Sequence, residues 1–214
     1  MHTRQSDILN EEVIRNYPIQ IVGAGGIGSI LVLTLCKMGF GNVTVWDYDT
    51  VEEHNIPNQY FPLSSIGQLK TEALKSIVKE MTGIEIKTRN KPFDKDDLNQ
   101  SGIVISAVDN METRMEIFNA CTYNSLFIDG RMGGISWSIY CAQPMIHGDR
   151  ELYKSEWYPT SEATPLKCTE KAIMFNAMSI ASEMANICKT FIADNEYPKY
   201  IRRNMNNYNI EVRR

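Results

Sequence analysis

A glycine-rich turn between two apolar runs, within residues 18–49, constrains the fold of this chain more than any other feature. Gly23, Gly25 and Gly28 fit the pattern G-x-G-x-x-G. In that pattern the first glycine permits a tight turn, the second lets backbone N–H groups approach a phosphate, and the third lets a helix pack close to a strand. The apolar run at 19–22 leaves no room for a helix before the glycines, which favours a buried parallel strand.

A helix and a second strand complete this unit. Apolar residues recur through 30–38 and stop at Gly39, which predicts a largely buried helix, and 43–46 predicts a strand. Asp47 follows that strand 19 residues beyond Gly28, close to the spacing at which a carboxylate meets ribose hydroxyls. The glycines alone could serve only to reverse the chain, but with the strands, the helix and the acid they indicate a nucleotide site.

The rest of the chain continues the alternation of strands and helices, which predicts a parallel sheet covered on both faces. We therefore expect an α/β fold, a Rossmann-like and mostly parallel sheet with helices on both faces, a short antiparallel extension and a long C-terminal helix. The expected strands are 84–88, 103–108, 126–128 and, antiparallel, 135–142, and the expected helices are 69–81, 112–121 and 170–192.

A single domain over 1–214 is the simplest organisation for a chain of this length. Residues 1–17 are expected to form an N-terminal helical arm with an amphipathic helix at 8–14, and 143–167, which lacks periodicity, a mobile crossover loop. The basic tail at 202–214 is interpreted as a solvated end.

Composition narrows the function classes. The net charge of −4, from 22 basic and 26 acidic residues, lacks the electrostatic signature of a nucleic-acid binder. No apolar run reaches 18 residues and the N-terminus lacks a secretory signal, so we expect no membrane span and a cytoplasmic protein. Five cysteines without a C-x-x-C pair make a four-cysteine zinc site improbable and favour reduced, mostly buried thiols.

Four acidic residues follow predicted strands, namely Asp47, Asp49, Asp109 and Asp129. Ligands of open parallel sheets bind beyond the carboxyl ends of the strands, so these side chains are expected around one crevice with the glycine turn. A nucleoside triphosphate there would bring Mg²⁺, which one or two carboxylates commonly hold together with phosphate oxygens. Asp109 is the preferred ligand, and a helix N-cap is the alternative role for a strand-end aspartate.

Lys70 and Cys168 are the other two candidates. Lys70 begins a predicted helix just after Gly67 and could direct its charge at phosphates, or it could simply be solvated. Cys168 lies before the long C-terminal helix, where Thr169 could cap the helix and backbone N–H groups would favour a thiolate. We expect either a nucleophile or a buried structural thiol there.

Six blocks in this order carry a specific family resemblance, namely IVGAGGIGS, VTVWDYDTVEEHNIPNQYF, GQLK, ISAVDNMETR, IDGRMGG and KCTEKA. With them the chain resembles the ThiF, MoeB and HesA group, the E1-like activators of ubiquitin-like proteins and sulfur carriers. The order of blocks covers most of the chain and is far more specific than the glycine turn alone.

The resemblance implies an E1-like adenylyltransferase, which uses ATP and Mg²⁺ to adenylate the C-terminal carboxylate of a small β-grasp protein and releases pyrophosphate. Physically this is phosphate positioning plus charge neutralisation. Carried over by motif, the residues that approach ATP are Gly23, Gly25, Gly26 and Gly28. In the D-x-D-x-V motif, Asp47 binds the ribose and Asp49 is the second acid. Asn55 and Lys70 face the phosphates, and Asp109 holds magnesium.

Two further roles come only from the resemblance. Arg4 resembles the N-terminal arginine that reaches into the partner subunit's ATP site, which implies a homodimer. Cys168 matches the cysteine that in some members accepts the activated acyl group as a thioester or joins in sulfur transfer.

The chain departs from the family pattern where an arginine is replaced by Asn58. Either Arg4 or Arg131 supplies the missing charge, or ATP turnover is impaired. The zinc-binding cysteine pairs of the MoeB branch are absent, so zinc is not expected. We also expect no separate catalytic-cysteine or ubiquitin-fold domain.

Three alternatives remain open from the sequence. A catalytically weak E1-like scaffold subunit that binds a partner protein is favoured by Asn58, whereas Lys70 and Asp109 favour the enzyme. A nicotinamide-dependent oxidoreductase is compatible with the glycines and Asp47 alone. Activation of a tRNA base or a peptide is possible within the family, although the acidic balance disfavours tRNA.

Overall fold

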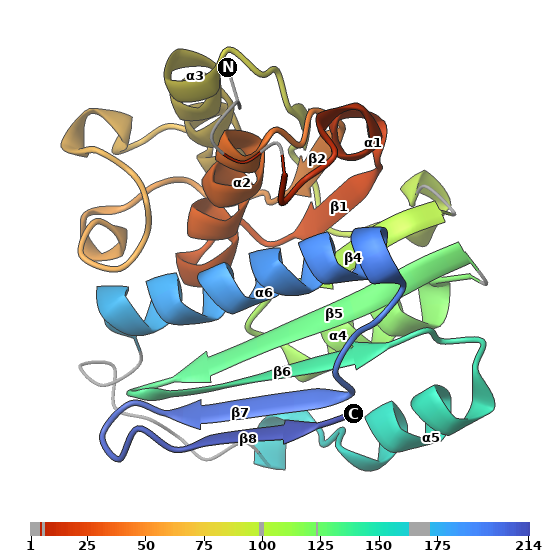
Figure 1. Cartoon of the computed structure of the whole chain (residues 1–214). Coiled ribbons are helices and arrows are strands. Elements are labelled where there is room, and N and C mark those ends of the chain that lie inside the picture. Colours follow the sequence, from red (N-terminus) through yellow and green to blue (C-terminus); the bar gives the residue numbers. More distant parts are fainter. Residues whose placement is uncertain (1–4, 6, 99–100, 123, 163–171) are drawn as a thin grey trace.

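An eight-stranded sheet runs through the chain in a computed structural model that describes residues 5, 7–98, 101–122, 124–162 and 172–214 (Figure 1). The strand order is β3-β2-β1-β4-β5-β6-β7-β8, in which the first five strands are parallel and the last three antiparallel. The strands are β1 Ile19–Val22, β2 Val43–Trp46, β3 Lys87–Arg89, β4 Ser101–Ser106, β5 Asn124–Gly133, β6 Ser136–Ala142, β7 Tyr200–Asn204 and β8 Ile210–Arg213.

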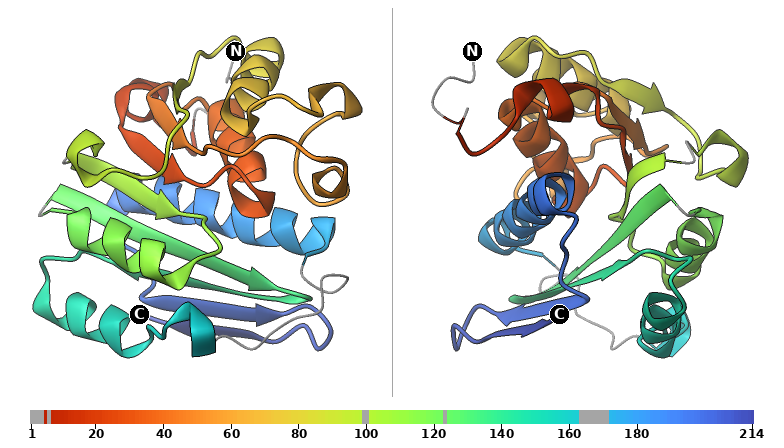
Figure 2. Two further views of the ribbon diagram at one scale, coloured as in Figure 1. Left: turned by 180° about the vertical axis from the view of Figure 1, so that it is seen from behind. Right: turned by 45° about the vertical axis from the view of Figure 1, so that its right-hand side comes forward.

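Helices cover both faces of this sheet. In Figure 1, α2 and α6 lie in front of the strands, and the reversed view in Figure 2 shows α4 and α5 on the opposite face. The helices are α1 Glu11–Asn16, α2 Gly26–Met38, α3 Lys70–Thr82, α4 Met111–Ala120, α5 His147–Ser155 and α6 Met174–Asp194. Short 3₁₀ turns lie at Glu53–Asn55, Leu63–Ser65, Lys95–Asp97 and Thr160–Glu162.

The helix α2 is apolar on nearly every side because it packs on β1 and β2 and has α6 and α3 as neighbours. Its residues from Ile27 to Leu33 are all buried. A helix with apolar residues all round is typical of such an interior position. It ends at Gly39, whose φ of 107° is the left-handed conformation that glycine adopts readily. This packing holds the glycine turn rigidly against the sheet.

The sequence-based fold class is confirmed: the sheet is mostly parallel with an antiparallel extension, helices lie on both faces, and a long helix, α6, follows near the end. The helix predicted at 8–14 begins later, at Glu11. The loop predicted over 143–167 is wrong where His147–Ser155 forms α5. The tail interpreted as solvated contains part of β7 and all of β8, which pair antiparallel.

The strand β5 is much longer than the predicted 126–128, since it continues to Gly133. Asp129 therefore lies inside a strand and is fully buried, so its expected place at a strand end was wrong. None of the described helices is long and apolar enough to cross a bilayer.

Candidate nucleotide site at the carboxyl edge of the sheet

The glycine turn joins β1 to α2 and abuts the turn that follows β4. Gly23 has a φ of 101°, and a Cβ built on it would lie 2.6 Å from the carbonyl oxygen of Ala107. A Cβ on Gly28 would lie 1.9 Å from the carbonyl oxygen of Gly23. Both positions exclude any larger residue, because strand, turn and helix touch through their backbones there. The sequence-based roles of the first and third glycines in the turn and packing agree with this geometry.

Gly25 differs from these two glycines because it faces open space. No heavy atom lies within 4 Å of a Cβ built on Gly25, which is the N-cap of α2 and makes no side-chain capping bond. The neighbouring Gly26 is more confined, with the carbonyl oxygen of Asn58 at 3.3 Å from its built Cβ. A free space at the start of a helix suits a phosphate group, because unpaired N–H groups and the helix dipole both favour an anion there.

Asp47 ties the end of β2 to the glycine turn. One carboxylate oxygen accepts a hydrogen bond from the Ala24 N–H at 2.7 Å, and the other accepts one from the Asp49 N–H at 2.8 Å. An ionised carboxylate has about four acceptor positions, so each oxygen can still accept a bond from a ribose hydroxyl. The structure thus places Asp47 beside the turn, as the sequence predicts.

Lys70 is not a solvated residue. Its ammonium lies 2.8 Å from a carboxylate oxygen of Asp49, and only 8% of its side chain is exposed, against 54% for Asp49. The backbone N–H of Lys70 also donates to the Asp49 carbonyl at 2.9 Å, and Thr50 bridges Leu69. These contacts close the loop of residues 50–69 and hold one cation next to an exposed acid at the carboxyl edge.

Asn55 and Asn58 belong to this closed loop. Asn55 is buried, and its side-chain oxygen accepts a hydrogen bond from the Glu52 N–H at 3.0 Å. That contact gives Asn55 a structural task in the 3₁₀ turn Glu53–Asn55. Asn58 is partly exposed and presents its carbonyl to Gly26, so the position of the missing family arginine lies next to the glycine turn.

Asp109 is exposed on the turn between β4 and α4. The N-cap of α4 is Asn110, whose side-chain oxygen accepts from the Thr113 N–H at 2.8 Å, so Asp109 does not fill the alternative capping role. No described residue forms a hydrogen bond or an ion pair with its carboxylate. Because Ala107 touches Gly23, this carboxylate belongs to the turn that adjoins the glycines. An unpaired acid in that place fits a cation bound together with phosphates.

Asp129, by contrast, is enclosed in a buried cluster that the sequence did not predict. Its carboxylate accepts from the guanidinium of Arg114, from Arg131 Nε at 2.8 Å and from the Tyr153 hydroxyl at 3.0 Å. Desolvation raises the pKa of Asp129, but the two guanidiniums together outweigh it and hold the pKa below its ordinary value. With these partners Asp129 serves structure, and its expected place in the crevice was wrong.

Arg131 cannot replace the missing family arginine from this position. Besides Asp129, it donates to the Glu156 carbonyl at 3.0 Å, and its guanidinium carbon lies 4.1 Å from the centre of the Tyr140 ring. Arg114, the other member of the cluster, was not singled out by sequence reasoning. The only available signal was its place one turn into the helix after the Asp109–Asn110 pair.

The other two site candidates, Arg4 and Cys168, lie outside the described residues. The remaining cysteines are buried and unpaired, as predicted. Burial raises the pKa of Cys36, Cys121 and Cys188 to about 12, so these thiols stay protonated at neutral pH.

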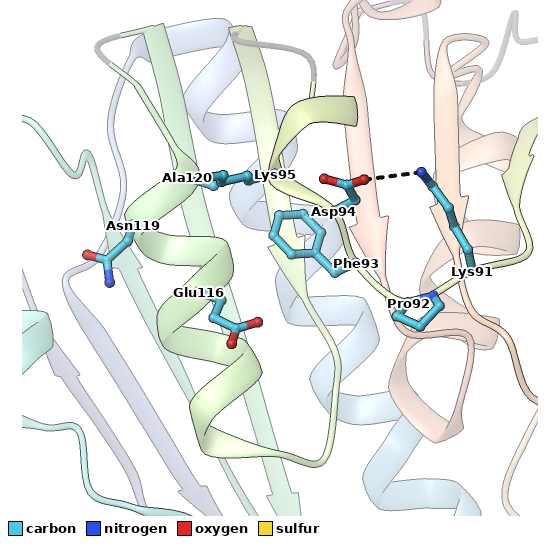
Figure 3. Close-up of a pocket in the computed structure, with 8 residues that line it drawn as sticks. All are labelled: Lys91, Pro92, Phe93, Asp94, Lys95, Glu116, Asn119 and Ala120. Atoms are coloured by element: carbon cyan, nitrogen blue, oxygen red, sulfur yellow. Dashed lines mark hydrogen bonds and ion pairs between the residues drawn. The ribbon is translucent and has the colours of Figure 1, made fainter.

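Two further features of the described residues bear on this site, namely their potential metal ligands and a cavity beside α4. The described residues contain no cluster of three or more His, Cys, Asp or Glu side chains that could hold a metal ion. A cavity of about 710 Å³ opens between residues 91–95 and the outer side of α4 (Figure 3). It includes none of the predicted site residues, and the Lys91 and Asp94 side chains at its rim pair with each other.

Comparison with known proteins decides the family. The profile of the ThiF family matches residues 4–213. The chain belongs to the ThiF family. Curated relatives include ubiquitin-like modifier-activating enzyme 5 of Arabidopsis thaliana, which is 34% identical over an alignment of 139 residues, with coverage of 55% of this chain and 32% of that protein. The Drosophila melanogaster enzyme of the same name is 32% identical over 140 residues, 58% of this chain and 35% of that protein. This ThiF-family chain therefore spans about a third of the length of these curated relatives.

Solved structures show the same fold. Escherichia coli MccB, crystallised with ATP, superimposes with a TM-score of 0.73 at 17% identity, over 99% of this chain and 70% of MccB. PaaA superimposes with a TM-score of 0.74 at 15% identity, over 94% of this chain and 74% of PaaA. The ThiF-family architecture is thus shared at identities too low to transfer a substrate.

Proposed function

We propose that this ThiF-family chain adenylates the C-terminal carboxylate of a small ubiquitin-like or sulfur-carrier protein of the β-grasp fold, with ATP and Mg²⁺. One observation carries the proposal: Gly25 lies at the start of α2 and faces open space, with no heavy atom within 4 Å of a Cβ built on it. Asp47 and Lys70 are held near the same edge by backbone contacts, and Asp109 lies on the turn that adjoins Gly23.

Each residue has a task in this reaction. The N–H groups at the start of α2 bind phosphate, Asp47 accepts from the ribose hydroxyls, and Lys70 exchanges its bond to Asp49 for a phosphate oxygen. Asp109 holds Mg²⁺, which would neutralise the charge on the phosphates. An oxygen of the carrier's C-terminal carboxylate then attacks the α-phosphorus while pyrophosphate leaves, and the carrier becomes an acyl adenylate.

The partners follow from the same proposal. Asn55 supports the loop that faces the phosphates, and Arg4 of a second copy would supply the charge that Asn58 lacks, which makes the active species a homodimer. The Cys168 thiolate then attacks the acyl carbon and displaces AMP to form a thioester, or a separate sulfur nucleophile displaces AMP from the adenylate in sulfur transfer. Both Arg4 and Cys168 lie outside the described residues, so these two roles rest on the family motifs.

The test is exchange of radiolabelled pyrophosphate into ATP by the purified chain, with Mg²⁺ and a panel of small β-grasp proteins that end in glycine. We expect exchange that requires the carrier and its free C-terminal carboxylate. Asp109→Asn should abolish exchange and leave the melting temperature unchanged, because the side chain is exposed. Full exchange by that variant would remove Asp109 from the site, and a carrier panel without exchange would count against the reaction.

A second candidate function is a scaffold that binds a partner protein without turnover. Asn58 at the arginine position and the closed Lys70–Asp49 ion pair favour it. ATP binding separates the two functions, since a scaffold need not bind ATP at all.

Within the adenylation chemistry, a peptide could replace the carrier, since the related fold of MccB has been crystallised with MccA. A peptide C-terminus should therefore be included in the exchange panel.

A further inference from the structure

Arg114 joins three parts of the structure through one guanidinium. Its Nη2 donates to the Val108 carbonyl, and its Nη1 donates both to the Gly130 carbonyl at 2.8 Å and to the Asp129 carboxylate. Arg114 is buried, with 5% of its surface exposed. The residue therefore links the turn after β4, the strand β5 and its own helix α4.

The direction of this side chain follows from helix geometry. Arg114 is the fourth residue of α4, and long side chains in a helix point back toward its N-terminus. The guanidinium thus returns to the turn that precedes α4 and meets the carbonyl of Val108, the residue before Asp109. Asp129 anchors the opposite side of the guanidinium and is itself held by Arg131 and Tyr153.

Few other contacts define this turn. The Ala107 N–H donates to the Val22 carbonyl at 2.8 Å, and Asn110 caps α4. Between these two residues the Asp109 carboxylate has no bond to any described residue. Its position is therefore set by the backbone on either side, and the described side-chain contact to the Val108 carbonyl comes from Arg114.

We propose that Arg114 is a positioning residue: it fixes the peptide that precedes Asp109 and so aims the Asp109 carboxylate at the metal. The role deepens the proposed function and rests on it. Residues that orient a metal ligand commonly contribute 10–100-fold to metal affinity or activity. A lysine would keep the charge beside Asp129, but its single ammonium cannot bridge the Val108 and Gly130 carbonyls as a planar guanidinium does.

The test compares Arg114→Lys with Arg131→Lys. Both changes remove one guanidinium from Asp129, but only Arg114 contacts the turn. Binding of α,β-methylene ATP is measured by calorimetry without Mg²⁺ and over a series of Mg²⁺ concentrations. We expect Arg114→Lys to raise the Mg²⁺ concentration at half-saturation by about tenfold or more, with metal-free nucleotide binding unchanged. Arg131→Lys should leave the Mg²⁺ dependence at the wild-type value.

Amide hydrogen exchange of the unliganded chains supplies a readout that needs no ligand. We expect faster exchange of residues 107–111 in Arg114→Lys, with β1 and β4 still protected. Unchanged exchange there, an equal loss of nucleotide binding with and without Mg²⁺, or the same Mg²⁺ shift in Arg131→Lys would overturn the positioning role.

Two further results distinguish a folding defect, and a lack of nucleotide binding, from failure of the positioning role. If Arg114→Lys does not fold, Arg114→Gln takes its place, and failure of both variants while Arg131→Lys folds would assign Arg114 to stability and overturn the role. A wild-type chain that binds no nucleotide at any Mg²⁺ concentration would instead overturn the proposed function, and the role with it.

Discussion

Gly25 and Gly28 belong to one sequence pattern, but Gly25 faces open space and Gly28 is in close backbone contact. Substitution by alanine should therefore affect ATP binding at Gly25 and stability at Gly28. Gly25→Ala should fold normally, since its φ is −80° and its Cβ would meet nothing within 4 Å, yet it should weaken ATP binding because the methyl group would stand where a phosphate approaches the start of α2. Gly28→Ala should cost about 2 kcal/mol or more, because its Cβ would clash with the Gly23 carbonyl. Calorimetry measures the effect on ATP binding and chemical denaturation the effect on stability. Normal ATP binding by Gly25→Ala would argue against a phosphate site at Gly25.

Single residues were predictable from the sequence where their task depends on the local backbone. The glycines, Asp47 and the exposed Asp109 all follow from a strand, turn and helix that are contiguous in the chain. Asp129 was misplaced because nothing in the local sequence shows that β5 continues beyond it. Its partners Arg114 and Arg131 become neighbours only in the folded sheet, so sequence reasoning could not pair them.

At the scale of elements, Asp129 and its partners Arg114, Arg131 and Tyr153 hold α4 and α5 against β5. The free energy of unfolding should therefore depend on pH in the acid range. The pKa of Asp129 is lower in the folded chain than the ordinary value of an aspartate, so the unfolded chain takes up the proton first. Its stabilising contribution is complete above that value and is lost as the pH falls through the folded pKa. Denaturation between pH 6 and 3 should show this loss.

Asp129→Asn is the control for that dependence. It should be less stable than the wild type near neutral pH, because two buried guanidiniums lose their counter-charge, at a cost of about 3–5 kcal/mol for a fully broken pair. As the pH falls, the free energy of unfolding of this variant should also decrease less steeply than that of the wild type. The two slopes should differ by at most the contribution of one proton, about 1.4 kcal/mol per pH unit. An unchanged slope would show that Asp129 does not titrate on unfolding.

A second contact between elements joins the segment after α5 to the start of α4. The Thr160 hydroxyl accepts from the Met111 N–H at 2.9 Å, and the Thr160 N–H donates to the Glu112 carboxylate at 2.9 Å. Thr160→Val should cost about 1 kcal/mol, because a helix-terminal N–H loses its partner. Thr160→Ser keeps the hydroxyl and should cost much less. Urea denaturation compares them, and equal stabilities would remove this contact from the energetics of α4.

Elements were predictable in proportion to the regularity of their apolar pattern. The segments that became β1, α2 and α3 combine apolar periodicity with glycine stops, and each was expected within a few residues. The helix α5 was missed because only Asp149 and Tyr153 are buried in it and its remaining surface is polar. The strands β7 and β8 were missed because β8 is exposed along its whole length and both strands carry charged residues, as a solvated tail would.

At the scale of the whole molecule, the proposed homodimer makes a complementation prediction. A chain with Arg4→Ala and a chain with Asp109→Asn should each be inactive in exchange. Mixed and allowed to exchange subunits, they should regain activity, because one site of each mixed dimer has an intact Asp109 and an intact Arg4 from its partner. Two Asp109→Asn chains give the matched control without recovery. Absence of recovery in mixed dimers verified by mass spectrometry would place Arg4 in its own subunit's site.

The helix α6 lies across α2, although the two are separated by more than a hundred residues in the chain (Figure 1). During synthesis, the glycine turn and β1 leave the ribosome early, but the apolar surface of α2 stays uncovered until residues 174–194 have emerged. The antiparallel pair of β5 and β6 precedes α6 in the chain and can form meanwhile, whereas β7 and β8 follow α6. A nascent chain that stalls before residue 174 would therefore expose a continuous apolar surface, the kind that chaperones bind.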